Sequence, residues 1–358
     1  MELLDYMARL FVSLMCLAVL VHATPTEWGI EHCHKAFHAT HTVCTFMRDH
    51  GKRYTIHNWR DKADVLMDAA RYIDAHNAKG TGMMLKLTPL SDMSHDEYKS
   101  HLRPLTRRVG RPRHKRRRRL RSPSTDLPEA FTWQGKGVLP RIVTQGDCGS
   151  CFAITAGTML NAWHARLQPQ SHVQRYSFQA LMDCASKYYP NDVEYCDGGT
   201  MAFPLRYAAE HHVPYETDVP YMQRGGTCPR HEPSYATLHP QEVFNFDSYV
   251  DHDPHLLQKL KGFIYHYGPV GLSIDASDRA LQHYAGGIYE PHRHGQTHCT
   301  KDNVNHAVTL VGYDQEAWIF ANSWSSSWGE KGYFRMRRGP HHCGMTEIIS
   351  VIKSAVIK

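Results

Sequence analysis

The sequence predicts an α+β protein in which a helical region and a basic linker precede a mixed body. Three observations lead to this fold class. Apolar residues recur at helical spacing between Trp59 and Ile73. Eleven Lys and Arg, with no acidic residue among them, crowd residues 103–121, which cannot pack into a core. Strand-like runs at 306–313, 317–322 and 332–337 end a region rich in Gly, Pro, aromatic residues and Cys.

The charge of the chain is concentrated in the linker. The 358 residues are 42% hydrophobic and 21% charged, which excludes a disordered chain. The formal charge of +6 would by itself favour a partner rich in phosphate. Residues 122–358, however, hold 19 Lys and Arg against 23 Asp and Glu, a charge of −4. We therefore expect an acidic body and no nucleic-acid partner.

The N-terminus resembles a targeting segment. The apolar stretch 10–21 is too short to span a bilayer comfortably, and Ala23 follows at a cleavage-like position. We expect a signal peptide over residues 1–23; a membrane anchor is the alternative. In the secretory pathway, cysteines are candidates for disulfides. Cys33 and Cys44 precede the linker, and whether they pair stays open.

The segment around Cys151 is the most informative. It reads Gln-Gly-Asp-Cys-Gly-Ser-Cys-Phe over residues 145–152, and Cys151 opens a long helix. The partial positive charge of a helix N-terminus lowers the pKa of a thiol. Cys148 and Cys151 could instead form a redox pair or half of a zinc site, but no second CxxC or CxxH accompanies them. Seven cysteines follow residue 121, so at least one thiol remains unpaired.

Three motifs together resemble the papain-like, cathepsin L-like cysteine peptidases. Besides residues 145–152, they are Asn-His-Ala-Val-Thr-Leu-Val-Gly-Tyr at 305–313 and Asn-Ser-Trp-Ser-Ser-Ser-Trp-Gly-Glu-Lys-Gly-Tyr at 322–333. The resemblance runs from Leu127 to the C-terminus and is weaker in the N-terminal region. It implies the papain-like two-domain fold, in which a helical half carries Cys151 and a β-barrel-like half carries His306 and Asn322, with the active site in the cleft between them.

The resemblance also implies the role of each catalytic residue. Cys151 is the nucleophile, and His306 forms a thiolate–imidazolium pair with it and protonates the leaving amine. Asn322 orients the imidazole, and Trp324 shields that hydrogen bond from water. Gln145, together with the backbone N–H of Cys151, forms the oxyanion hole. No metal or cofactor takes part.

The disulfides and substrate contacts follow from the same resemblance. The implied disulfides are Cys148–Cys196, Cys184–Cys228 and Cys299–Cys343. The implied substrate-binding residues are Gly198, Gly199, Met201, Ser273, Val304, Ala307, Trp324 and Ile348. Ile348, at the floor of the pocket for the residue second upstream of the cut, cannot compensate a guanidinium, so we expect an apolar residue there.

Two features depart from the family pattern or extend it. Phe152 stands where the family usually has Trp. His211 and His212 resemble the paired histidines of cathepsin B-like exopeptidases, but the accompanying loop insertion is absent. Two surface histidines are the simpler interpretation, and we expect an endopeptidase. The alternative from another class is a catalytically silent binding or matrix protein on the same fold.

The expected precursor has four parts: a signal peptide (1–23), an inhibitory pro-region (24–102), a basic linker with a processing site (103–126) and a peptidase domain (127–358). The pro-region would lie through the cleft in the non-productive direction. A basic-specific protease would cut the linker; an anionic-surface tether and a plain solvated linker are alternatives. Eleven of the 27 His precede residue 122 and either sense pH or have no such role.

The expected partners are protein or peptide substrates, the chain's own pro-region and cystatin-like inhibitors, and we expect a monomer. The chain contains no Asn-x-Ser/Thr sequon. Glycan-dependent sorting is therefore not open to it, and the expected location is extracellular or lysosomal.

Overall fold

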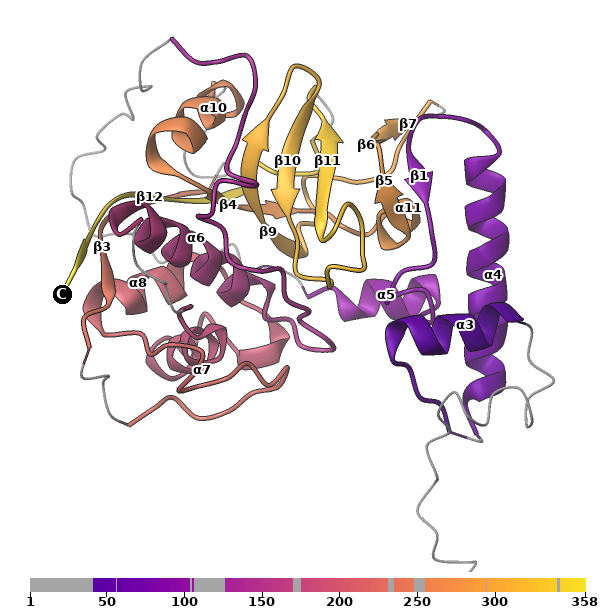
Figure 1. The fold of residues 1–358 in the computed structure, drawn as a ribbon, viewed down its shortest axis with the longest axis horizontal. Coiled ribbons are helices and arrows are strands. Elements are labelled where there is room, and N and C mark those ends of the chain that lie inside the picture. Colours follow the sequence, from indigo (N-terminus) through magenta and orange to yellow (C-terminus); the bar gives the residue numbers. More distant parts are fainter. Residues whose placement is uncertain are drawn as a thin grey trace, which may run out of the picture. The chain divides into compact units, whose positions relative to one another are not determined.

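A computed structural model describes residues 41–55, 57–103, 105, 126–169, 175–230, 235–247, 255–293, 295–339 and 342–358 (Figure 1). The predicted signal peptide, Cys33 and most of the predicted linker lie outside this part of the chain. The chain forms two compact units, residues 1–71 and residues 72–358. The second unit therefore includes the last part of the predicted pro-region as well as the whole predicted peptidase domain.

The first unit contains helix α3 (His41–His50) and the beginning of α4 (Trp59–Asn77). The helical spacing seen in the sequence between Trp59 and Ile73 thus corresponds to α4. Buried apolar residues recur at helical intervals on both helices, as an amphipathic face requires. These residues are Val43, Phe46, Met47, Leu66 and Ala69. Cys44 is disulfide-bonded.

The second unit begins with the end of α4, strand β1 (Met84–Leu85) and helix α5 (His95–His101). A capping box starts α5, because the Ser94 hydroxyl accepts from the Glu97 N–H and the Glu97 carboxylate accepts from the Ser94 N–H. Strand β1 pairs antiparallel with β5 (Tyr284–Gly286). Backbone hydrogen bonds therefore attach the end of the predicted pro-region to the body of the unit.

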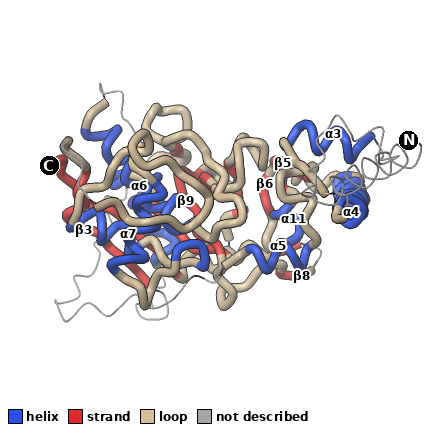
Figure 2. The backbone as a smooth tube through the Cα atoms, turned by 90° about the horizontal axis from the view of Figure 1, so that it is seen from below, coloured by secondary structure: helices blue, strands red, loops and turns tan. Residues whose placement is uncertain are grey.

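The helical half of the second unit surrounds helix α6 (Cys151–Leu167). Every residue of α6 from Cys151 to His164 is buried, as expected for a helix at the centre of a core. Its neighbours are α7 (Phe178–Tyr188), the 3-10 helix η1 (Tyr195–Asp197) and α8 (Ala202–Glu210). Figures 1 and 2 show α6 beside strand β9 of the other half, and the two elements are in contact.

The other half is a sheet with the strand order β3-β12-β4-β9-β10-β11-β6, while β2 also pairs with β9. The bounds of these strands are β2 (Phe131–Thr132), β3 (Leu238–Asp247), β4 (Val270–Ile274), β6 (Ile288–Tyr289), β9 (His306–Tyr313), β10 (Ala317–Ala321), β11 (Tyr333–Arg337) and β12 (Ile348–Ile357). Helices α10 (Leu256–Tyr267) and α11 (Arg279–Gln282) and the pair β7 (His292–Arg293) and β8 (Gln296–Thr297) complete the described elements. The pairs are antiparallel except β6 with β11, which is parallel.

The predicted α+β class is confirmed by this arrangement of a helical half and a sheet half. The three strand-like runs of the sequence correspond to β9, β10 and β11. All eight residues of β9 are buried, because helix α6 covers one side of this strand and further core residues cover the other. Each half has its own apolar core. Strand β9, which begins at His306, lies where the two cores adjoin.

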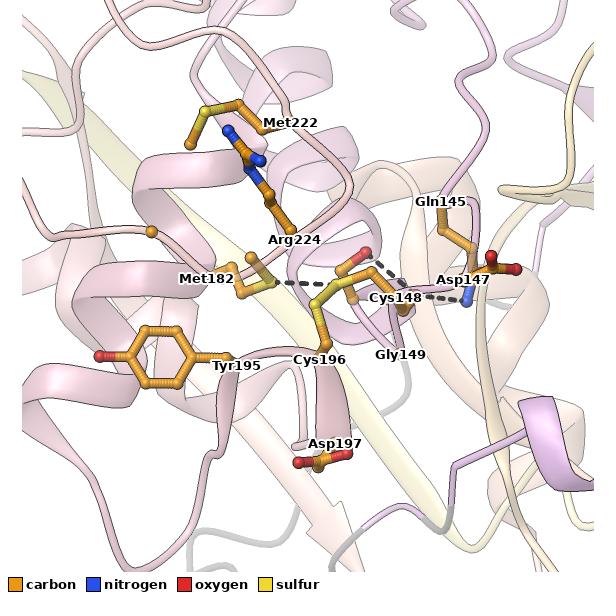
Figure 3. The surroundings of a disulfide bond; sticks show 12 residues. Gln145, Asp147, Cys148, Gly149, Met182, Tyr195, Cys196, Asp197, Met222 and Arg224 are labelled. Carbon is orange, nitrogen blue, oxygen red and sulfur yellow. Dashed lines mark hydrogen bonds between the residues drawn. A yellow bond between two sulfur atoms is a disulfide. The ribbon is translucent and has the colours of Figure 1, made fainter. Parts of the chain in front are cut away.

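Three disulfides fix the second unit: Cys148–Cys196, Cys184–Cys228 and Cys299–Cys343. These are the pairings that the family resemblance implies. Cys148 is bonded to Cys196 (Figure 3), so it forms neither a redox pair nor a metal site with Cys151. Among the described cysteines, Cys151 alone carries a free thiol.

Candidate active site

Cys151 lies at the first residue of α6, after the turn formed by Cys148, Gly149 and Ser150. Gly149 donates its N–H to the Cys196 carbonyl at 2.8 Å, beside the disulfide between Cys148 and Cys196 (Figure 3). The thiol is 2% exposed. Its sulfur accepts a hydrogen bond from the Ala307 backbone N–H at 3.4 Å. This contact joins the start of α6 to the start of β9 and brings the residue next to His306 to the sulfur.

His306 is held by Asn322, which follows directly after β10. Its Nε2 lies 2.7 Å from Asn322 Oδ1. The Ser323 N–H also donates to Asn322 Oδ1, at 2.8 Å, so the oxygen of that amide faces this side. An amide oxygen only accepts, and Nε2 must therefore carry the proton. In the neutral ring, Nδ1 remains as the acceptor that a thiol needs.

Trp324 covers the His306–Asn322 pair. Its ring stacks on the imidazole with centroids 4.6 Å apart and an interplanar angle of 25°. The ring is itself held edge-on by Trp328, at a centroid distance of 5.1 Å. Trp324 and Asn322 are both buried. A hydrogen bond kept from water in this way is stronger electrostatically than an exposed one.

Gln145 is attached to the same segment. Its backbone N–H donates to the Ser323 carbonyl at 2.8 Å, and its Oε1 accepts from the Ser323 hydroxyl at 2.7 Å. The amide nitrogen therefore turns the other way and donates to the Cys148 carbonyl at 3.0 Å, as Figure 3 shows. The donor end of the Gln145 side chain thus faces the turn that leads into Cys151.

The pocket residues that the resemblance implies come together around one core. Met201, Val304, Ala307 and Ile348 belong to the same buried cluster as Cys151. Ser273 is buried beside them, but its hydroxyl donates to the Gly344 carbonyl at 3.2 Å and accepts from the Ile348 N–H at 3.0 Å. Ser273 therefore contributes a buried support under Ile348.

The glycine segment of the expected substrate strand lies next to the nucleophile turn. Gly198 has φ of +115°, a conformation that favours glycine. An added Cβ on Gly199 would lie 3.2 Å from the Phe152 ring, so the backbone approaches α6 closely. Phe152 is fully buried and packs in the helical core. The Phe152 ring thus packs against the backbone of the glycine segment.

The end of the predicted pro-region and the start of the predicted linker cover these residues. We call residues 98–103 together with Leu105 the covering segment. Tyr98 packs edge-on against Trp324, with centroids 5.8 Å apart, and His101 Nδ1 lies 3.8 Å from Asp147. Arg103 lies 3.9 Å from Asp197.

Leu105 ends the covering segment beside an implied pocket residue. Its N–H donates to the Val304 carbonyl at 3.2 Å. Its side chain is 4% exposed and belongs to the same buried cluster as Met201, Val304 and Ile348. A leucine of the chain itself is therefore buried in the apolar core to which the implied pocket residues belong.

The covered site favours neutral groups. Burial raises the pKa of the Cys151 thiol to about 11, although hydrogen bonds from backbone N–H groups, with Ala307 first, oppose the rise. Burial lowers the pKa of His306 to about 4, and the hydrogen bond to Asn322 opposes this shift. A thiolate or an imidazolium in such surroundings loses its hydration, so the charged form is penalised. At neutral pH the covered pair is a thiol and a neutral imidazole.

Three functional contacts were not predicted from the sequence. Ser323 is hydrogen-bonded to Gln145, Tyr98 contacts Trp324, and Leu105 is hydrogen-bonded to the Val304 carbonyl. Ser323 could have been identified in the sequence from its place within the motif at 322–333. No pattern marks Leu105, because it stands alone between Pro104 and the arginines of the linker.

The paired histidines have structural contacts in the helical half. His211 stacks on Tyr207, with centroids 4.9 Å apart, and His212 Nδ1 lies 2.9 Å from the Thr237 hydroxyl. Both histidines are half-buried rather than fully exposed, and the absence of an exopeptidase role for them stays a prediction. Across the described ranges, no helix is both long and apolar enough to cross a membrane. No group of three or more His, Cys, Asp or Glu in the same ranges is arranged to hold a metal ion.

Comparisons with known proteins agree with this geometry. The model of the "Papain family cysteine protease" family matches residues 127–352. Cysteine proteinase RD21A of Arabidopsis thaliana is 30% identical over 298 residues, which cover 81% of this chain; the chain spans only 60% of that relative. Procathepsin L of Mus musculus is 29% identical over 296 residues, covering 78% of this chain and 82% of that protein.

Solved structures have the same fold. Digestive procathepsin L 3 of the Tenebrio molitor larval midgut superposes with a TM-score of 0.72 at 25% identity, covering 86% of this chain and 97% of that one. The proform of the ragweed pollen cysteine protease Amb a 11 superposes with a TM-score of 0.69 at 24% identity, covering 86% of this chain and 92% of that one. The catalytic geometry, the family match and the covering segment therefore lead to one conclusion: the chain belongs to the papain family of cysteine proteases, as a cysteine-type endopeptidase in zymogen form.

Proposed function

We propose that the activated chain hydrolyses peptide bonds through Cys151 and His306. The Cys151 thiolate attacks the scissile carbonyl carbon, and the imidazolium of His306 gives its proton to the leaving amine. The thioester formed on Cys151 is then attacked by water, which loses a proton to His306 as the carboxylic acid leaves. Gln145 and the Cys151 N–H stabilise the oxyanion in both steps. The observation that carries the proposal is the sulfur contact at the start of β9, beside the clamped His306–Asn322 pair.

Removal of the covering segment supplies the charges that this chemistry needs. With the segment in place, burial favours a neutral thiol and a neutral imidazole, as the pKa directions of Cys151 and His306 indicate. When the segment leaves, water reaches both groups and the penalty on the charged forms falls. The N-terminus of α6 then favours the thiolate. The zymogen is thus kept silent by exclusion of water as well as by obstruction.

We propose an apolar preference for the residue second upstream of the cut. Met201, Val304, Ala307 and Ile348 belong to the same buried apolar cluster as the Leu105 side chain, and the Leu105 N–H donates to the Val304 carbonyl. Leucine therefore fits these surroundings, whereas a guanidinium would lie on Ile348 without a counter-charge. Backbone groups of Gly198 and Gly199 would bind the substrate as an extended strand with little sequence preference.

The proposed organisation of the precursor follows the sequence expectations. A signal peptide over 1–23 and a cut in the basic linker 103–126 would release the domain 127–358 from an inhibitory pro-region 24–102. The disulfides and the cathepsin L-like relatives support a secretory or lysosomal protein, and we propose the extracellular space or the lysosome as its site of action. Cystatin-like inhibitors and a basic-specific activating protease are the proposed partners of a monomeric enzyme.

Labelling of the processed protein tests the function. A peptidyl epoxide or vinyl sulfone should modify Cys151 in the wild type and leave the Cys151→Ala variant unlabelled. A catalytically silent binding protein would remain unlabelled in both forms. A peptide library that varies the residue second upstream of the cut should show Leu cleaved faster than Arg.

A further inference from the structure

Residues 145–151, which we call the turn before the nucleophile, carry the two proposed oxyanion donors at their ends. Gln145 begins this turn, and the backbone N–H of Cys151 ends it. The hydroxyl of Tyr221 contacts both ends. It donates to the Gln145 carbonyl at 3.1 Å and is hydrogen-bonded to the Ser150 hydroxyl. The mechanism proposed above uses neither contact.

The hydrogen bond between Ser150 and Tyr221 takes the place of the usual N-cap hydrogen bond of a serine side chain. It is the N-cap residue of α6, where a serine hydroxyl commonly accepts from an N–H of the first helical turn. In this structure the Ser150 side chain makes no such capping hydrogen bond. Its hydroxyl instead contacts the Tyr221 hydroxyl and lies 3.5 Å from the Cys148 carbonyl, while the Ala153 N–H donates to the Ser150 carbonyl.

The two hydroxyls connect the ends of the turn. The Tyr221 hydroxyl donates to the Gln145 carbonyl, and the Ser150 hydroxyl is hydrogen-bonded to the Tyr221 oxygen and lies 3.5 Å from the Cys148 carbonyl. Burial raises the pKa of Tyr221 to about 12, so the hydroxyl stays neutral at any working pH of the enzyme. A continuous hydrogen-bonded chain therefore links the two ends of the turn through one rigid ring.

The loop that begins with Tyr221 is attached to helix α7. Residues 221–228, which we call the support loop, are attached to α7 by hydrogen bonds and a disulfide. The contacts are Met222 N–H to Gln179 Oε1 at 2.9 Å, Gln179 Nε2 to the Arg224 carbonyl at 2.8 Å, Gly226 N–H to Asp183 Oδ1 at 3.0 Å, and Cys184–Cys228. The support loop thus fixes Tyr221 relative to α7, and the Tyr221 hydroxyl in turn restrains the turn before the nucleophile.

We propose that Tyr221 is a positioning residue that sets the spacing between the two oxyanion donors. It touches neither substrate nor the reacting atoms and acts through Gln145 and Ser150. Without its hydroxyl, the backbone at Gln145 loses one restraint and the Ser150 hydroxyl loses one hydrogen-bond partner. The donors then fit the tetrahedral oxyanion less well, while the nucleophile itself is unchanged. This inference rests on the proposed peptidase function.

The test compares two inhibitors on activated Tyr221→Phe enzyme. The Cys151 thiol adds to the carbonyl of a peptide aldehyde, and the oxygen of the resulting hemithioacetal occupies the oxyanion hole. A peptidyl epoxide alkylates the sulfur by ring opening and places no oxyanion there. We expect the aldehyde Ki to rise and kcat to fall by the same roughly three- to tenfold factor. KM and the rate of epoxide alkylation should remain as in the wild type.

A Ser150→Ala variant and a double variant complete the test. Because both hydroxyls belong to one chain, Ser150→Ala should raise the aldehyde Ki in the same direction, and the double variant should show less than the sum of the two effects. Ser150→Ala also serves if Tyr221→Phe fails to fold.

The matched control is Tyr176→Phe. Tyr176 is also buried in the helical half, and its hydroxyl accepts from the Leu238 N–H at 2.6 Å. This variant should lower Tm without changing the ratio of aldehyde Ki to epoxide rate. Equal loss against both inhibitors in Tyr221→Phe, or no loss against either, would overturn the inference. A wild type that the epoxide does not label would instead remove the proposed function.

Discussion

Removal of the Tyr98 hydroxyl should weaken the hold of the covering segment over the active site. Tyr98 is fully buried, and its hydroxyl donates to the Ala276 carbonyl at 2.6 Å. Tyr98→Phe leaves that buried carbonyl without its partner, at a cost of about 1–3 kcal/mol. This energy corresponds to a roughly 5- to 150-fold larger fraction of zymogen with an open site. Tyr98→Ala also removes the ring against Trp324 and should cost about 3–5 kcal/mol.

The assay is the rate at which a fluorescent epoxide labels intact zymogen at pH 7. Linker arginines 116–119 are replaced by Ala in every sample, so that processing does not open the site. The labelling rate should rise from wild type to Tyr98→Phe and again to Tyr98→Ala. Lys99→Ala is the matched control on α5, because its exposed pair with Asp96 contributes little. Tyr98→Phe zymogen that is labelled no faster than the Lys99→Ala control would refute the reasoning.

Three further predictions concern the site itself. Asn322→Ala removes the 2.7 Å hydrogen bond to His306 and should lower kcat/KM roughly 10- to 100-fold, measured with a fluorogenic peptide; activity equal to wild type would contradict the assigned role. Ile348→Glu should shift cleavage from substrates with Leu towards those with Arg second upstream of the cut, and an unchanged library profile would count against the pocket. Because burial raises the pKa of Cys151 to about 11, the covered thiol is protonated below that pH, and alkylation of zymogen by iodoacetamide should still be increasing between pH 8 and 10. Activated enzyme should reach its plateau at lower pH, and a zymogen rate already level at pH 7 would argue against water exclusion.

The catalytic residues could be recognised from the sequence because each stands in a local motif. His306 opens a continuous apolar run, which became the buried strand β9, and Asn322 follows the next strand. A short continuous apolar run that is rich in β-branched residues is consistent with a buried strand, and the polar residue at its end marks the chemistry. The position of these two residues near Cys151 depends on the tertiary fold, and only the family resemblance predicted it.

Contacts that depend on the path of the chain could not be predicted. Leu105 is one apolar residue in a basic run, and no periodicity marks it as buried. Tyr221 and Ser150 are 71 positions apart, and each has an ordinary local explanation, as a loop aromatic and as a helix cap. The expected place of Ser273 in the pocket lining stays a prediction, but the hydrogen bonds of its hydroxyl to Gly344 and Ile348 could not be read from the sequence. Side-chain direction at such positions follows from packing rather than from residue type.

Helix α4 shows that a residue pattern does not reveal to which compact unit a segment belongs. The helical spacing in 59–73 identifies α4 correctly, yet residues 1–71 and 72–358 form separate units and the boundary falls within that helix. An amphipathic pattern tells which face of a helix is buried, but it does not tell what covers it.

The arrangement of the disulfides makes the second unit tolerant of nicking. Cys148–Cys196 and Cys184–Cys228 overlap along the chain, so together they enclose residues 148–228 without a gap, and Cys299–Cys343 encloses a second stretch. A single peptide-bond cut inside either stretch leaves both new ends covalently joined. In a compartment where proteases meet each other, damage of that kind produces a two-chain molecule of the same composition, and the nucleophile at residue 151 stays attached to the strand that carries its histidine.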